Sequence, residues 1–189
     1  MREIHLFVRF QRILLLASDS SSVDSWESPS AENRLGSLTG HLLMLGVELR
    51  GGLPCPRCFL RRSAEAAIEV AHLAAPRDLH PFEAVDHLAR IQQTRLSDEA
   101  AAAVDPWRLL SPEIHLERAF WQLAGLAHAL AGGLGQAGHE EHAADLASSL
   151  VFAAVTSGAW ERALRRVPRA APVYPTTAFR LRNSPGPVS

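Results

Sequence analysis

The sequence predicts a mainly α-helical protein: an antiparallel, alanine-rich helical bundle with a small N-terminal β-hairpin that carries a Cys-x-x-Cys turn. Apolar residues recur every three or four positions from Phe59 onward, which is helical periodicity. Alanine is common where helices should face each other, and small side chains let helix axes approach closely. The 189 residues divide into an N-terminal extension with a Ser-rich linker (1–43), a bundle domain with the hairpin (44–167) and a Pro-rich flexible tail (168–189).

The first elements are expected to be short and extended. In "EIHLFVRF" the apolar residues Ile4, Leu6, Val8 and Phe10 alternate with other residues, and this period of two favours a strand, with Phe7 as the exception. The overlapping run "RFQRILLLAS" could equally belong to a short helix. The serine- and acid-rich stretch 19–33 is typical of a loop. A compact domain is expected to begin near Met44, followed by a hairpin in "VELRGGLPC".

The rest of the chain is expected to be helical. A first helix covers Phe59–Ala75 and ends before Pro76, and a second starts at Pro81. Ser97 is expected to cap a further short helix. The clearest start is Ser111-Pro112-Glu113, which combines a capping hydroxyl, a first-turn proline and an acid at the positive end of the helix dipole. A last long helix spans 139–166, with Gly158 as its weak point.

Composition excludes several kinds of chemistry. All 19 basic residues are arginine, so enzymes that need a lysine amine, such as P-loop proteins, Schiff-base enzymes and Ser–Lys hydrolases, are excluded. The net charge of −1 favours neither a nucleic acid nor a membrane surface as the partner. The apolar run Ile13–Ser18 is too short to span a membrane, and Arg9 and Arg12 interrupt any signal-peptide core, so we expect a cytoplasmic protein.

Cys55 and Cys58, in "CPRC", are the residues most suggestive of chemistry, and three interpretations stay open. The pair is half of a tetrahedral zinc site. It also lies just before a helix, where a thiolate is stabilised, and C-P-x-C is similar to the motif of glutaredoxins, although the strands and proline loop of that family do not follow. The third interpretation is a turn with two inert reduced thiols.

A zinc site needs two more ligands, and geometry limits them. If Phe59–Ala75 is one helix, His72 lies roughly 21 Å along the axis from Cys58, which excludes it. His41 is possible but leaves the site one ligand short. A second copy of the protein would complete four thiolates across a two-fold axis, as in zinc-hook dimers, so zinc is the expected cofactor, if there is one.

Carboxylates and histidines at helical spacings suggest a second metal chemistry. Glu69 and His72 form an E-x-x-H pair, and further pairs are Glu83 with His87, Glu113 with Glu117, and His139 and His142 with Asp145. The pattern resembles di-metal carboxylate bundles and helical, magnesium-dependent nucleotide pyrophosphohydrolases. It departs from both, because only one E-x-x-H is present and the paired acidic motifs are missing. Exposed ion pairs explain the same spacings without a metal.

The remaining candidates are surfaces. Arg57, Arg61 and Arg62 flank the cysteines and suit phosphate or a partner. We therefore expect a small non-enzymatic interaction or assembly protein that self-associates or binds another protein, with Trp107, Trp121 and Trp160 as possible anchors. The alternatives are a zinc-stabilised nucleic-acid-binding regulatory module and a metal-dependent helical hydrolase of the nucleotide pyrophosphohydrolase type.

Overall fold

The computed structural model describes residues 2–19, 30–51, 55–76, 79–100, 110–133 and 136–165. The regular elements of these residues are all helices, which confirms the mainly α prediction and the helical bundle. In chain order they are α1 (Arg2–Asp19), α2 (Ala31–Arg50), α3 (Pro56–Ala74), α4 (Pro81–Ala100), α5 (Pro112–His128), a π-helical turn (Ala129–Gly133), α6 (Gln136–Thr156) and α7 (Ala159–Arg165).

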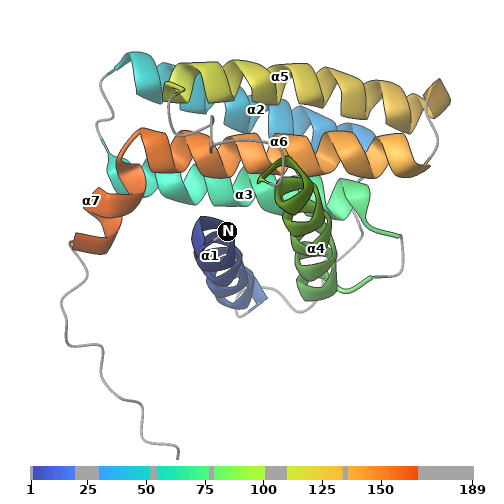
Figure 1. Ribbon diagram of the computed structural model, residues 1–189, viewed down its shortest axis with the longest axis horizontal. Helices are drawn as coiled ribbons and strands as arrows, with labels where there is room; N and C mark the ends of the chain where they lie inside the picture. Colours follow the sequence, from blue (N-terminus) through green and yellow to red (C-terminus); the bar gives the residue numbers. More distant parts are fainter. Residues whose placement is uncertain are drawn as a thin grey trace, which may run out of the picture.

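The helices form three layers around a central pair (Figure 1). Helices α3 and α6 contact each other in the middle layer, and each also contacts helices of both outer layers. Helices α2 and α5 cover one side, and α1 and α4 cover the other side at a steep angle. In sequence colours, α2 and α3 run in opposite directions, as do α5 and α6 (Figure 1). The short α7 lies against α3.

Buried alanines are frequent on the two central helices. Ala64, Ala67 and Ala71 on α3 and Ala143 and Ala147 on α6 are all at most 2% exposed. Their spacing of three and four residues places each set on one helix face. A face with single methyl groups brings helix axes close, so the larger side chains on either side, such as Leu and Phe, fill the space between layers.

Local sequence explains where the helices begin. The hydroxyl oxygens of Ser30 and Ser111 accept hydrogen bonds from the amides of Asn33 and Ile114, which caps α2 and α5. Proline occupies the first turn of α3 and of α5, where its missing N–H costs no helical hydrogen bond. The expected start at Ser111 is therefore confirmed.

The predicted N-terminal β-hairpin is wrong. Residues 46–50 are the last turn of α2, and Gly51 caps that helix with its backbone N–H on the carbonyls of Val47 and Leu49. Leu38, Leu42 and Leu45 are fully buried at spacings of four and three, which is a helical core stripe. The glycines within this segment hid the helical period from the sequence, and residues 52–54 of the expected hairpin lie outside the described part.

The strand predicted over residues 4–10 is also wrong, because these residues belong to α1. The buried residues are Ile4, Phe7, Gln11 and Leu15, at spacings of three and four. Phe7, the exception to the alternating pattern, is only 2% exposed and therefore marks the true period. In a segment with apolar residues on most sides, the pattern fits both the two-residue period of a strand and the 3.6-residue period of a helix. Packing against α3 and α4 selects the helix.

Two helix boundaries also differ from expectation. Helix α4 continues through Ser97, whose hydroxyl donates to the carbonyl of Gln93, so this serine does not start a helix. The predicted last long helix breaks at Gly158, which has φ +68°, a conformation that favours glycine. Ser157 then caps α7 by accepting a hydrogen bond from Ala159 N at 3.2 Å.

The expected division near Met44 falls within α2. Leu38 and Leu42 before it and Leu45 after it are buried in the same core, together with Ile4 and Phe7 of α1. The expected linker overlaps the start of α2, and its residues 20–29 lie outside the described part, as does the tail 168–189.

Gly125 sets the separation of α5 from α6. A Cβ atom at this position would lie 2.5 Å from the ring of His142, whose Nδ1 is 2.7 Å from Gln122 Oε1. The imidazole of α6 therefore lies directly on the backbone of α5, and only glycine provides that space.

We expect Gly125→Ala to lower the free energy of unfolding by about 1–3 kcal/mol, because the new methyl group overpacks the α5–α6 contact. Urea denaturation followed by circular dichroism measures this. Gly46→Ala is the matched control, because a Cβ there meets only Leu116 Cδ2 at 3.6 Å, and the alanine should raise stability by about 0.5–1 kcal/mol. Equal effects of the two substitutions would contradict the packing argument.

Candidate functional site

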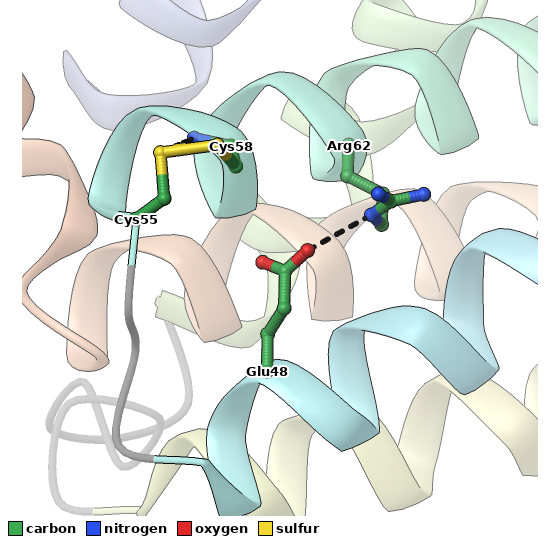
Figure 2. The surroundings of a disulfide bond; sticks show 4 residues. All are labelled: Glu48, Cys55, Cys58 and Arg62. Atoms are coloured by element: carbon green, nitrogen blue, oxygen red, sulfur yellow. Dashed lines mark hydrogen bonds and ion pairs between the residues drawn. A yellow bond between two sulfur atoms is a disulfide. The ribbon is translucent and has the colours of Figure 1, made fainter.

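The cysteine pair lies at the start of α3. Cys55 is the N-cap residue, and its Sγ accepts a hydrogen bond from Cys58 N at 3.2 Å. Pro56 follows in the first turn, and the two sulfur atoms are joined in a disulfide (Figure 2). Cys55 is half-buried and Cys58 is exposed. One sulfur thus occupies the position that the helix N-terminus stabilises, and the other cysteine faces solvent.

This disulfide contributes little to holding the fold together. It closes a loop of only four residues, which removes few conformations from the unfolded chain. The loop-entropy relation gives roughly 2 kcal/mol for such a loop, below the values for longer ones. A role in thiol chemistry therefore fits this position better than a role as a stabilising cross-link.

The arginines that follow the cysteines are mostly paired. Arg61 contacts Glu65 at 2.7 Å on the helix surface, and Arg62 donates to Glu48 Oε1 of α2 at 3.1 Å. Near the start of α7, Arg162 donates to the carbonyls of Ser157 and Gly158. The pairing neutralises much of the positive charge that suggested phosphate contacts at Arg61 and Arg62.

Glu48 is the residue near the pair that the sequence did not suggest. It reaches from α2 to Arg62, one helical turn after Cys58 (Figure 2). Its side chain is only 12% exposed, and its second oxygen, Oε2, is buried without a hydrogen-bond partner among the described residues. Oε2 of Glu48 therefore keeps the capacity to accept a further hydrogen bond.

The ligands expected for metals do not gather. Among the residues that the structure describes, no three histidines, cysteines or acids form a group that could hold a metal ion. Glu69 instead pairs with Arg34 at 2.7 Å, Asp145 with Arg95 at 2.9 Å, and Glu83 accepts from His80 N at 3.1 Å. Glu69 and Asp145 therefore serve in part-buried ion pairs between helices, not in the exposed pairs within one helix that the alternative explanation expects, and Glu83 serves as a helix cap.

Helix α2 carries an exposed apolar face that the sequence analysis missed. Leu43, Met44 and Val47 are 57%, 44% and 62% exposed. On the neighbouring α5, Ile114 is 41% and Trp121 is 73% exposed. Trp160 instead packs partly against the core, 6.5 Å from the ring of Phe7, and Trp107 lies outside the described residues. The signal was present in the sequence, because these α2 residues follow Gly36 and Gly40 at helical spacing.

A groove of about 600 Å³ separates α1 from α4. Its charged lining mixes Arg9, Arg12 and Arg90 with Glu83 and Asp86, and Arg12 pairs with Asp86 at 3.0 Å. The groove therefore presents both signs of charge.

Comparison with known proteins gives no further direction: no protein family, no curated protein and no solved structure matches the chain. Within the described ranges, none of the helices has the length and apolar character that a membrane crossing requires.

His72, excluded above as a zinc ligand, makes stability depend on pH. Burial, the positive charge of Arg34 and the neighbouring His80 lower its pKa to about 4 from 6.5. As the pH falls from about 6.5 to about 4, the unfolded chain binds a proton that the folded chain refuses, so the folded state loses stability. Burial also lowers the pKa of His139, which acts in the same direction.

We therefore expect a loss of about 1–2 kcal/mol at His72 on acidification, after allowance for solvent screening of a partly exposed ring. Urea midpoints measured from neutral pH down to about pH 4.5 give this slope. His72→Gln should flatten the slope, whereas His5→Gln, at an exposed position on α1, should not. An unchanged slope in His72→Gln would rule out this assignment.

Proposed function

We propose that this chain is a small non-enzymatic protein that acts by association, with a second copy of itself as the partner. The observation that supports the proposal is the exposed face of α2. Three large apolar side chains, Leu43, Met44 and Val47, lie within five residues and remain largely in contact with solvent. Single exposed apolar residues are ordinary, but a cluster on one helix face is characteristic of an interaction surface.

Helix α2 is well suited to present such a surface. Its opposite face is anchored in the core by Leu38, Leu42 and Leu45, which are fully buried. The salt bridges Arg34–Glu69 and Arg62–Glu48 further hold it against α3. A partner therefore meets a rigid helix, and association loses little conformational entropy in the backbone.

No observation specifically supports either alternative function, the metal-dependent hydrolase or the nucleic-acid-binding module. The hydrolase lacks its gathered carboxylates among the described residues, and the nucleic-acid module lacks unpaired arginines at Arg61 and Arg62. Zinc shared between two chains stays a prediction that requires both cysteines in the reduced form. A cytoplasmic location also stays part of the proposal. Disulfides in that compartment are mostly transient and take part in exchange, so a Cys-x-x-Cys disulfide is compatible with it.

Leu43→Glu should weaken self-association at least tenfold, because a carboxylate on the contact face is costly to bury. Sedimentation equilibrium or native mass spectrometry over a concentration series measures the effect. The matched control is Leu16→Glu on α1, where the leucine is exposed to a similar extent, 61% against 57%. A wild-type chain that stays monomeric up to high micromolar concentration would refute the proposal.

The disulfide favours a second candidate function, thiol–disulfide exchange with a protein dithiol. The geometry supplies the roles. A substrate thiolate attacks the sulfur of the exposed Cys58, the disulfide breaks, and its electron pair leaves on Cys55, where the Cys58 amide stabilises the thiolate. A second substrate thiolate then attacks the substrate sulfur of the mixed disulfide and releases Cys58 as a thiolate. The substrate becomes a disulfide, and the pair, having gained two electrons, becomes a dithiol.

If this exchange operates, the pair should pass reversibly between dithiol and disulfide in glutathione buffers, as alkylation and mass spectrometry will show. Reduction should leave the helical content intact and lower the free energy of unfolding by about 2 kcal/mol at most. Unfolding on reduction would instead assign the disulfide a structural role, and stoichiometric zinc binding by the reduced chain would favour the zinc hypothesis.

A further inference from the structure

Six exposed residues form one continuous stripe along α2. They are Glu32, Gly36, Gly40, Leu43, Val47 and Arg50. Their steps of four, four, three, four and three are the spacing of residues that line a helix–helix seam. The core contacts of α2 use a different set, with Leu38, Leu42 and Leu45, so the stripe is a second seam with no helix packed on it among the described residues.

We propose that this stripe packs antiparallel against the same stripe of a second copy, about a two-fold axis between positions 41 and 42. This inference rests on the proposed self-association and adds its geometry. In this register Gly36 faces the partner's Val47, and Gly40 faces the partner's Leu43. Both pairs have the same midpoint, so one axis satisfies them together.

The pairing matches side-chain size. A Cβ built on Gly36 or Gly40 meets nothing within 4 Å, so the chain itself does not use the space above these glycines. Glycine in the middle of a helix is destabilising relative to alanine. Two such glycines on an open face therefore have no purpose in the isolated fold, but they accommodate Leu43 and Val47 of an antiparallel partner and let the axes approach closely.

Charge selects the direction. Glu32 lies in the first turn of α2 and Arg50 in the last, and neither forms an ion pair with another described residue. Antiparallel packing brings Glu32 of each chain close to Arg50 of the other. The two residues are offset by one position from the register that the glycine pairs define. Parallel packing would place the two Glu32 carboxylates together, and likewise the two Arg50 side chains, and would also set glycine opposite glycine.

The same geometry separates the cysteine pairs. Residue 50 lies about 13 Å along the helix from the two-fold axis, so the two α2 C-termini lie roughly 26 Å apart along it. The CPRC turns follow these opposite ends. A dimer formed through α2 therefore excludes a zinc ion shared between the two turns, and each turn remains available for its own chemistry.

Charge reversal tests the register in the full-length chain. Glu32→Arg and Arg50→Glu should each weaken the dimer about five- to thirtyfold at low salt, because two-fold symmetry turns two attractive pairs into two repulsive ones. The double variant should restore the dissociation constant to within about threefold of the wild type. Sedimentation equilibrium gives the constants, and the effect should shrink at high salt. Both positions are exposed, and circular dichroism verifies that the variants fold.

A second substitution tests the size match. Gly40→Leu fills the space meant for the partner's Leu43 and should weaken association about tenfold. Gly46→Ala, which faces α5 of its own chain, should not. If the chain dimerises but the double charge variant fails to restore association, the antiparallel register is overturned while self-association stands. A wild-type chain that remains monomeric overturns both.

Discussion

The close approach of α3 and α6 is the constraint on which the rest of the structure depends. About half of their buried residues are alanine, and at the neighbouring α5–α6 contact Gly125 plays the same part against the ring of His142. Small residues at these contacts gain little from burial individually, but they let two central helices act as one layer. Each outer helix then needs only one apolar stripe, the one that faces α3 and α6. The fold places no requirement on the residues of α2 and α5 that face away from this layer. The exposed apolar residues on α2 are therefore not demanded by the fold.

The sequence predicted well where period and capping agreed. Ser111-Pro112 gave the start of α5, and the stripe after Phe59 gave α3, because a cap and a regular apolar face specify the same helix. It failed where a signal had two meanings. In α1 the apolar residues supported period two until packing selected Ile4, Phe7 and Leu15. At the end of α2, Gly51 and Gly52 favoured a hairpin turn, although residues 47–50 belong to the helix and Gly51 caps it.

The cysteine pair shows a different limit. Spacing and the flanking prolines placed Cys55 and Cys58 at a helix start, but the sequence could not say which atoms surround them. The cap by the Cys58 amide, and Glu48 arriving from α2, follow from how α2 packs on α3. The sequence analysis predicted a hairpin at residues 46–50. A hairpin there does not place Glu48 beside Arg62, whereas the helix does. The error in local structure therefore concealed the acid that pairs with Arg62, one helical turn after Cys58.

Self-association and thiol–disulfide exchange both involve the region where α2 is followed by α3, but they use different faces of α2. The turn from α2 to α3 begins at Gly51, so the helix that carries the stripe ends just before the cysteines. The stripe uses the face of α2 that points away from the core, whereas Glu48 and its bond to Arg62 use the face toward α3. An effect of reduction that passes through Arg62 would therefore reach the inner face of α2, whereas association acts on the outer face. Since Leu45 and Leu49 pack against the core between these two faces, a change at one reaches the other only by moving the whole helix. A rigid α2 thus predicts that dimer affinity is the same for the oxidised and reduced chains.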